Sequence, residues 1–335
     1  MEQSWRGSMV ENSEKSNDDV QGEYELPASQ KNCVVIINTK AGTSSDWDPE
    51  NLRASVAEKL SEGFSRVHTV CVEPEDFTSA LENAIEEAPD AIIVGGGDGS
   101  VRSAAGLLVD TDIALGVLPL GTLNRLARDL RMPLEVDEAA AVLAAAPIEA
   151  MDTAELNGEI FLCNSLIGLP LQVADRRRKL RGQTLLNRLS GYWSLLVDVL
   201  STTQKITLEL DDHREPKKVR AISIAVSNNR YEETPSLMMQ KCSLQGGELA
   251  VYVARHDTGA SLMLSVVRAM LGLWRNDPDV DEFRTKSMTI KPKGKKIRVS
   301  NDGEVEVVSG PLEYRVREKN LRVLLPTEQQ ARQGL

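Results

Sequence analysis

Residues 91–100 read AIIVGGGDGS, and residues 113–124 read IALGVLPLGTLN. In both stretches a short apolar run is followed at once by glycine and small polar residues, which predicts a buried strand that ends in a tight loop. Helix-like segments follow at residues 101–108 and 122–130. Two consecutive strand–loop–helix units predict neighbouring parallel strands, and open sheets of this kind bind ligands at the carboxyl ends of their strands.

The same alternation extends toward the N-terminus. Residues 33–38 and 67–72 are strand-like, and each run precedes a helix-like segment, the second at residues 76–87. Asp48 is predicted to cap the first of these helices, with Pro49 at its first position. Strands that alternate with helices predict an α/β N-terminal lobe in which helices cover a parallel sheet.

After residue 146 the pattern changes to short strands separated by turns, which predicts a β-rich C-terminal lobe. The predicted strands lie at residues 160–164, 205–210, 221–226, 249–253, 287–290, 296–299 and 321–324, and the predicted helices at 184–200 and 261–274. We expect four parts in the chain, which are a disordered tail at 1–30, an α/β domain at 31–150, a β-rich domain at 151–326 and a tail at 327–335.

Composition narrows the classes of partner. The 335 residues carry a net charge of -11 at pH 7, so we expect no nucleic-acid partner, because binding phosphates needs an excess of Lys and Arg. No apolar run reaches the roughly 20 residues that a membrane-spanning helix needs, and the N-terminus lacks the order of a signal peptide, so we expect a cytoplasmic protein. The four cysteines and three histidines are scattered, which predicts neither a disulfide framework nor a zinc site.

The first loop is suited to phosphate binding. Between Gly95 and Gly99 only Asp98 has a side chain beyond hydrogen, so backbone amides can approach a phosphate closely, and the N-terminus of the next helix adds a favourable partial charge. Asp98 is a candidate ligand for the magnesium ion that accompanies ATP. The alternative is a tight turn with a chance aspartate. No GKS or GKT follows the loop, which excludes a P-loop.

The second loop is PLGTLN at residues 119–124. Pro119 and Gly121 predict a sharp turn, and Thr122 is predicted to cap the next helix and to present its hydroxyl to a ligand. An ordinary helix cap is the alternative, and for this loop alone it is the better one. Because both loops follow neighbouring strands, their conjunction favours a nucleotide site.

These motifs together resemble those of the diacylglycerol kinase catalytic family, which includes sphingosine kinases and bacterial lipid kinases. The family patterns are close to NPxSG, GGDGT and PxGTxN, and this chain has NTKAG at 38–42, GGGDGS at 95–100 and PLGTLNRLARDL at 119–130. The resemblance covers nearly the whole chain from residue 31. It continues into FLCNSLIG at 161–168, VSNNRY at 226–231, GEL at 247–249 and NDGE at 301–304.

The resemblance implies an ATP-dependent lipid kinase that transfers the γ-phosphate to a hydroxyl of diacylglycerol or a related lipid. It implies a nucleotide-binding domain at 31–150, a lipid-substrate domain at 151–326, and both ATP and magnesium, the latter on Asp98. The implied catalytic residues are Asp98, Asp302 and Glu304. The resemblance does not settle which of Asp302 and Glu304 accepts the proton, and we favour Asp302 as the metal-linked or orienting group and Glu304 as the proton acceptor. The implied nucleotide contacts are Asn38, Gly42, Gly96, Gly97, Asp98, Gly99, Ser100 and Thr122.

Two other functions stay open on the sequence. One is a kinase of a soluble alcohol, because NAD kinases also use GGDG-type loops. The other is a non-catalytic nucleotide- or lipid-sensing module, suggested by departures from the family pattern. Arg102 and Arg125 are such departures, and each is either an extra phosphate ligand or an exposed helix arginine. Gly246 stands where bacterial relatives often have an Asp that helps to hold a structural magnesium, which puts that second metal site in doubt.

A lipid kinase must also reach a bilayer. Basic residues gather at 176–179 with Arg181 and Arg188, and again between Lys286 and Arg298. The first cluster predicts peripheral contact at the inner membrane surface or, equally, a solvated helix face, while the second can attract nucleotide. The apolar segment 261–274 is more typical of a core helix than of a lipid contact. The sequence leaves homodimer formation open.

Overall fold

The computed structural model describes residues 31–42, 48–168, 206–211, 217–232, 240–256, 258–271, 273–327 and 329–330. The predicted tail at 1–30, the predicted helix at 184–200 and the basic residues at 176–179, 181 and 188 lie outside these residues. Within them, no helix is both long and apolar enough to cross a bilayer.

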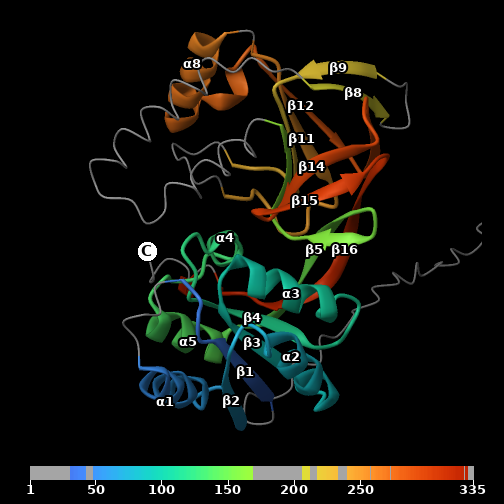
Figure 1. The fold of residues 1–335 in the computed structure, drawn as a ribbon. Helices are drawn as coiled ribbons and strands as arrows, with labels where there is room; N and C mark the ends of the chain where they lie inside the picture. Colours follow the sequence, from blue (N-terminus) through green and yellow to red (C-terminus); the bar gives the residue numbers. More distant parts are fainter. Residues whose placement is uncertain are drawn as a thin grey trace, which may run out of the picture.

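The N-terminal lobe is a parallel sheet in the order β2-β1-β3-β4 with helices around it, as predicted (Figure 1). The first pairs are in parallel register, with Cys33 opposite both Val67 and Ala91. The strands are β1 (Asn32–Asn38), β2 (Arg66–Val72), β3 (Ala91–Gly96) and β4 (Ala114–Pro119). The helices are α1 (Pro49–Leu60), α2 (Phe77–Glu86), α3 (Asp98–Leu108), α4 (Arg125–Asp129) and α5 (Val136–Ala145).

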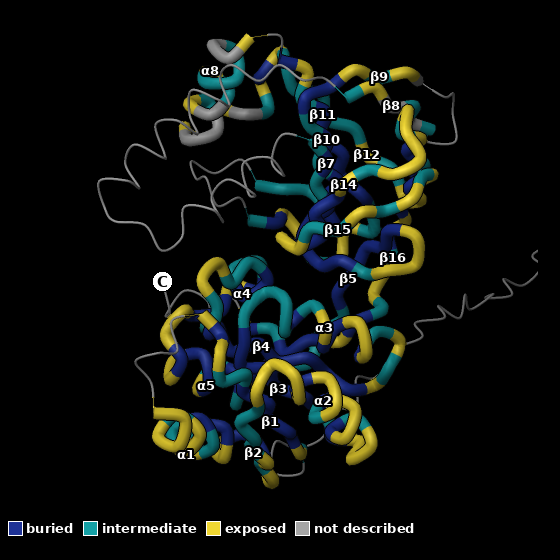
Figure 2. The backbone as a smooth tube through the Cα atoms, viewed as in Figure 1, coloured by how far each residue is buried: buried dark blue, intermediate teal, exposed yellow. Residues whose placement is uncertain are grey.

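The local reasons for these elements are visible in α1. The Asp48 side chain accepts a hydrogen bond from the Glu50 amide, and Pro49 occupies the first turn, so the predicted cap is confirmed. Val56 and Leu60 are fully buried against the sheet and α5. The strands β3 and β4 are buried along their whole length and run through the centre of the lobe (Figure 2), as expected for a sheet covered on both faces.

The C-terminal lobe is β-rich, also as predicted. One sheet has the order β12-β11-β10-β7-β14-β15, and its strands pair antiparallel. Its members are β7 (Asn164–Gly168), β10 (Ser223–Asn228), β11 (Leu249–Ala254), β12 (Val280–Thr285), β14 (Lys296–Asn301) and β15 (Glu304–Ser309). The helix α8 (Gly259–Met270) and the short turn η3 (Trp274–Asn276) lie between β11 and β12 in the chain.

A long final strand joins the two lobes. β16 (Leu312–Leu324) pairs with β5 and β13 in the C-terminal lobe, and its end pairs with β4 of the N-terminal sheet, Val323 opposite Leu115. Leu321, Val323 and Leu324 belong to the N-terminal core. The remaining strands of this sheet are β5 (Ile148–Leu156), β6 (Glu159–Phe161), β8 (Ile206–Asp211), β9 (Lys217–Ala221) and β13 (Ser287–Pro292). The division near residue 150 stays a prediction, and β16 crosses it.

Two local predictions were wrong. The helix predicted at 122–130 begins only at Arg125, and the residue before it is Asn124 in the left-handed region, so Thr122 is not its cap. The Asn124 side chain accepts from the Gly121 amide at 2.8 Å and donates to the Pro119 carbonyl at 3.2 Å, which closes the turn. The strand predicted at 160–164 is divided between β6 and β7, because the intervening amides bond to a side chain of another loop.

Candidate active site

Three loops meet at the carboxyl ends of β1, β3 and β4. The Asn38 side-chain amide donates to the Ser100 hydroxyl at 3.1 Å, which ties the first loop to the second. Gly42 has a φ of +60°, and a Cβ there would lie 2.2 Å from the Leu120 carbonyl oxygen, so only glycine fits against the third loop. The sequence motifs around residues 38–42, 95–100 and 119–124 are therefore brought together as predicted.

Close packing of the two glycine loops requires glycine at one of their contact positions but not at the other. A Cβ at Gly121 would lie 2.6 Å from the Gly97 Cα, so Gly121 is required for the close approach of the loops. A Cβ at Gly97 would lie 3.6 Å from the Gly121 Cα, which is an ordinary contact, and Gly97 has an extended backbone. Neither backbone nor packing requires glycine at position 97, so the space above it is available to a ligand.

Asp98 is the first residue of α3 and is partly withdrawn from solvent. Its carboxyl oxygen accepts a hydrogen bond from the Arg125 amide at 2.6 Å. Burial raises the pKa of Asp98, the nearby Asp302 charge raises it further, and the Arg125 amide and charge oppose both. Asp98 is therefore the candidate magnesium ligand at this end of the sheet, and the Asp302 charge lies near it.

Asp302 lies in the two-residue loop of the hairpin β14–β15. Its φ is +51° and that of Gly303 is +96°, which is the backbone of a tight hairpin turn, and Asp-Gly is a favoured pair in such turns. Its buried carboxyl group accepts three backbone hydrogen bonds, from the amides of Leu162 at 2.7 Å, Cys163 at 2.8 Å and Asn164 at 3.0 Å. Asp302 is thus rigidly held, and it fixes the segment between β6 and β7.

Glu304 presents a different environment at the start of β15. Its side chain is 63% exposed and forms an ion pair with Arg102 at 3.3 Å. A Cβ at Gly99 would lie 2.7 Å from the Glu304 Oε1 atom, so the carboxylate reaches the N-terminus of α3. The fold therefore places Glu304 beside a glycine loop that is far from it in the sequence.

The two unusual arginines bridge the lobes. The Arg102 guanidinium donates to the Ile160 carbonyl at 3.1 Å and pairs with Glu304, and its side chain is only 15% exposed. The Arg125 guanidinium donates to the Asn164 side chain at 3.1 Å. The view of both as exposed helix arginines is therefore wrong, while a phosphate-binding role stays a prediction.

A largely buried charged pair next to these arginines was missed from the sequence. Burial raises the pKa of Asp129 to about 6, and the Lys241 charge and Cys163 thiol oppose that rise. Lys241 is itself buried, donates to the Cys163 carbonyl at 2.7 Å and lies 4.6 Å from the centre of the Tyr231 ring. A carboxyl group with a raised pKa near a buried lysine is typical of a functional site. Asp129 lies within the stretch PLGTLNRLARDL but was given no role, and no motif marks Lys241.

The second metal site is not supported by the residues present. Asp152, fully buried, accepts from the Gly247 amide at 2.7 Å and the Asn229 side chain at 3.0 Å with one oxygen, and from the Lys319 amide at 2.8 Å with the other. Position 246 has no carboxylate, and a Cβ there would lie 2.6 Å from the Asn229 oxygen. Protein donors occupy the carboxylate, so this donor set does not fit a structural magnesium.

Of the other predicted contact residues, Gly96 ends β3 with a Cβ position 2.6 Å from the Ser100 Cβ, and Thr122 lies exposed in the turn before α4. The structure thus brings every predicted site residue to one end of the N-terminal sheet, facing the β14–β15 hairpin. Their individual roles stay predictions.

Known families match both parts of the chain. A family model described as "Diacylglycerol kinase catalytic domain" matches residues 32–156. A second model, described as "YegS C-terminal NAD kinase beta sandwich-like domain", matches residues 172–325. Residues 32–156 are therefore similar to diacylglycerol kinase catalytic domains. The first match covers the three loops, and the second covers the hairpin with Asp302 and Glu304.

Individual relatives agree with this assignment. Two proteins named "Probable lipid kinase YegS-like" are similar, one from Pseudomonas syringae pv. syringae (strain B728a) at 32% identity over 147 residues and one from Yersinia pestis (strain Pestoides F) at 32% over 139. These matches cover 43% and 40% of this chain and 46% and 45% of the relatives, so the chain spans about half the length of the curated relatives it matches. The crystal structure of a diacylglycerol kinase from Bacillus anthracis str. Sterne has the same fold, with a TM-score of 0.65 at 20% identity over 88% of this chain and 97% of that one.

Proposed function

We propose that this protein is an ATP-dependent lipid kinase that transfers the γ-phosphate of ATP to a lipid hydroxyl. The observation that carries the proposal is the meeting of Asp98, Asp302 and Glu304 at the N-terminus of α3, beside the two glycine loops. Phosphoryl transfer needs positioning, charge stabilisation and a carboxylate that orients the attacking hydroxyl, and these groups supply all three.

The nucleotide phosphates would lie over the open surface of Gly97. The loop amides and the N-terminus of α3 face this position, and a helix of this length contributes a useful partial positive charge. Asp98 would hold magnesium, which supplies neutralisation of the phosphate charge when bound. The raised pKa of Asp98 is consistent with a carboxylate that gains from a nearby cation.

Glu304 is the better candidate for the proton acceptor. The three backbone amides on Asp302 occupy most of its acceptor capacity, so its role is to hold residues 162–164 and to add negative charge beside Asp98. Glu304 is exposed beside the N-terminus of α3 and forms an ion pair with Arg102. A general base must be within hydrogen-bond reach of the hydroxyl that it deprotonates, and this carboxylate is free to approach a substrate.

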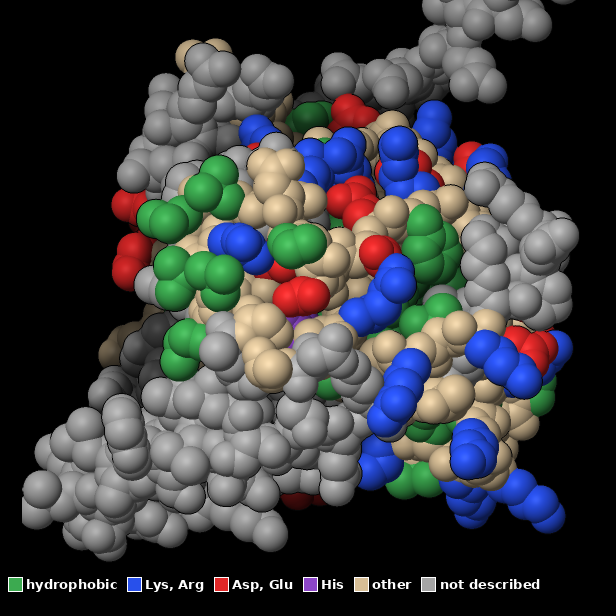
Figure 3. All heavy atoms as spheres, turned by 90° about the horizontal axis from the view of Figure 1, so that it is seen from above, with side chains coloured by type: hydrophobic (Ala, Val, Ile, Leu, Met, Phe, Trp, Pro, Cys, Tyr) green, Lys and Arg blue, Asp and Glu red, His purple; other side chains and the backbone are tan. Residues whose placement is uncertain are grey.

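The outer face of α8 is our candidate for lipid contact. Leu264, Val267 and Leu271 are spaced three and four residues apart and are 48%, 43% and 60% exposed, with Leu273 50% exposed. Figure 3 shows hydrophobic side chains gathered on one side of this end of the molecule. An exposed apolar stripe of this kind is typical of an interaction surface, and a lipid kinase needs one that meets a bilayer.

A kinase of a soluble alcohol is the second candidate, since the C-terminal part matches a domain described as NAD kinase-like. Magnesium-dependent ATP consumption should be measured with mixed micelles of diacylglycerol, monoacylglycerol and sphingosine, and separately with NAD. We expect phosphorylation of at least one lipid and none of NAD. Phosphorylated NAD without phosphorylated lipid would favour the second candidate, and no turnover with any acceptor would favour a sensing module.

A further inference from the structure

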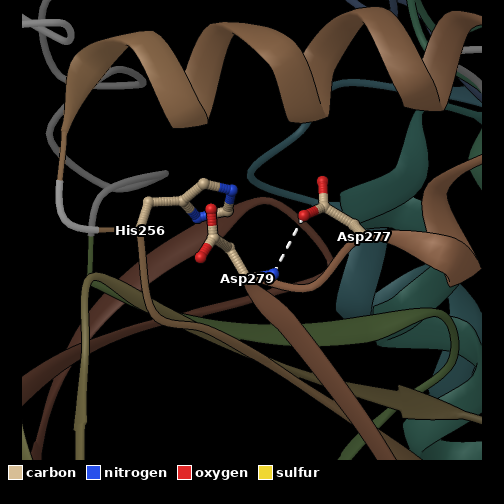
Figure 4. Close-up of side chains that lie close together, drawn as sticks. All are labelled: His256, Asp277 and Asp279. Carbon is tan, nitrogen blue, oxygen red and sulfur yellow. Dashed lines mark hydrogen bonds between the residues drawn. The ribbon is translucent and has the colours of Figure 1, made fainter.

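A side-chain cluster far from the glycine loops contains an imidazole and two carboxyl groups. His256 follows β11, and Asp277 and Asp279 lie between η3 and β12. One ligand atom from each residue lies within 4.8 Å of the others. Figure 4 shows the three side chains turned toward one another beneath α8.

The hydrogen bonds of His256 determine which nitrogen carries its proton. The Ser265 hydroxyl donates to the Ser261 carbonyl at 3.1 Å, so its oxygen accepts from the His256 Nε2 atom that it contacts. Nε2 is then protonated, and Nδ1 carries a free electron pair. His256 is 2% exposed and Nδ1 has no hydrogen-bond partner.

Asp277 shows the same imbalance. Its Oδ1 atom accepts from the Asp279 amide at 3.0 Å and pairs with Arg268 at 3.2 Å. Its Oδ2 atom is buried without a partner, and the residue is 4% exposed. Figure 4 shows the oxygen that accepts from Asp279 turned toward His256 and Asp279, and the other oxygen turned toward α8. Partners that orient a carboxylate in this way are typical of the shell around metal ligands.

Buried acceptors without donors are costly, since each loses its hydration. In this cluster the unpartnered His256 Nδ1 atom belongs to a ring that lies beside the carboxylates of Asp277 and Asp279. Arg268 compensates the charge of one carboxylate through Asp277, which leaves one negative charge beside a neutral imidazole. A cation between the three groups would bind the free imidazole nitrogen and offset that charge.

We propose that His256, Asp277 and Asp279 bind a divalent cation of the zinc class. One imidazole nitrogen with two carboxylate oxygens suits zinc and its neighbours in the transition series, whereas magnesium and calcium prefer oxygen ligands alone. Ligand atoms around tetrahedral zinc are about 3.3 Å apart and here lie within 4.8 Å of one another, so the side chains need to close by up to about 1.5 Å. The site would fasten α8, through Ser265 and Arg268, to the end of the β11–β12 pair.

The sequence predicted no zinc site, because its cysteines and histidines are scattered. The proposed ligands are one histidine and two aspartates from segments some twenty residues apart. No spacing motif marks such a set, and only the fold brings it together.

Zinc binding to the full chain should be measured by competition with a chromogenic chelator, together with the thermal unfolding midpoint with and without zinc. We expect one equivalent of zinc to bind and the midpoint to rise. His256→Ala and Asp279→Asn should each weaken that binding at least tenfold. His68→Ala should not, because His68 lies in the other lobe on an exposed surface, beside Glu87.

The Asp279→Asn variant keeps the test decisive if His256→Ala fails to fold. Asp279 is only partly buried, and it is its backbone amide, which the substitution keeps, that donates to Asp277. The proposal is overturned if the folded Asp279→Asn variant binds as much zinc as the wild-type chain, or if the wild-type chain binds none. In the first case zinc would bind at other groups, such as the cysteines.

Discussion

Replacing Asp302 by Asn tests whether this aspartate holds the structure, the chemistry or both. Asn has the same shape and tolerates the left-handed backbone found at this position, so the change removes charge without backbone strain. In the best rotamer of the Asn side chain, the oxygen still accepts from the Cys163 and Asn164 amides. The NH₂ group then faces the Leu162 amide, which in the wild-type protein donates to the second Asp302 oxygen at 2.7 Å. One buried N–H then loses its partner.

The cost can be estimated from these bonds. An unsatisfied buried donor costs roughly 1–3 kcal/mol, and the two remaining bonds lose the charge that makes them about twice as strong as neutral ones. We therefore expect Asp302→Asn to lower the free energy of unfolding by about 3 kcal/mol. Some of the loss is offset because Asp98 no longer faces a like charge.

Urea denaturation followed by circular dichroism measures this difference, with Glu304→Gln as the matched control two residues away. Glu304 is exposed, and without it Arg102 keeps its hydrogen bond to the Ile160 carbonyl, so the substitution should change stability by less than about 1 kcal/mol. The same control should lower kcat by a factor of ~10² to 10⁴ if Glu304 is the base. An Asp302→Asn midpoint equal to wild type would refute the structural role of this carboxylate, and a wild-type kcat for Glu304→Gln would refute the proton-acceptor role.

Four further outcomes are expected. Gly97→Ala should leave the unfolding midpoint unchanged, because the added Cβ makes an ordinary contact. The same variant should weaken ATP binding at least about tenfold, and an unchanged affinity in calorimetry would place the phosphates elsewhere. Asp98→Asn should lower kcat by at least ~10² without lowering the melting temperature, since burial already penalises its charge; normal turnover in the folded variant would remove the metal role. The pKa of Asp129 is raised to about 6 in the folded protein, so ionisation of Asp129 should lower the stability of the wild-type protein as the pH rises from about 4 to 6. Asp129→Asn should flatten that part of the curve of Tm against pH, and parallel curves for the two proteins would contradict the raised pKa. Leu271→Asp should reduce sedimentation with lipid vesicles while Leu107→Asp, exposed to 40% on α3, should not; equal effects would exclude α8 as the lipid contact.

Much of the fold could be predicted because its signals are local. The buried strands β3 and β4 are continuous apolar runs bounded by glycine, and the Asp-Gly pair at 302–303 is a turn signal by itself. By contrast β12 reads VDEFRT, whose charged residues hide the strand pattern. The helix α5 begins without a side-chain cap, so its start is not marked.

The candidate site was predictable in membership but not in roles. The motifs name Asp98, Asp302 and Glu304, yet nothing local indicates that Asp302 is saturated by amides about 140 residues away while Glu304 stays exposed. The burial of Lys241 and Asp129 likewise depends on how α4 meets the second lobe. Such pairings are set by tertiary packing, which a single sequence does not encode in any fixed spacing.

The path of β16 has a consequence for the order in which the protein forms during synthesis. Chains generally fold from the N-terminus as they leave the ribosome, but the strand that covers the edge of β4, β16 at Leu312–Leu324, is translated long after β4 at Ala114–Pro119. Until then the nascent N-terminal half exposes an apolar sheet edge of the kind that recruits other strands. A fragment ending near residue 150 would carry that edge permanently, and it would aggregate where the full chain does not.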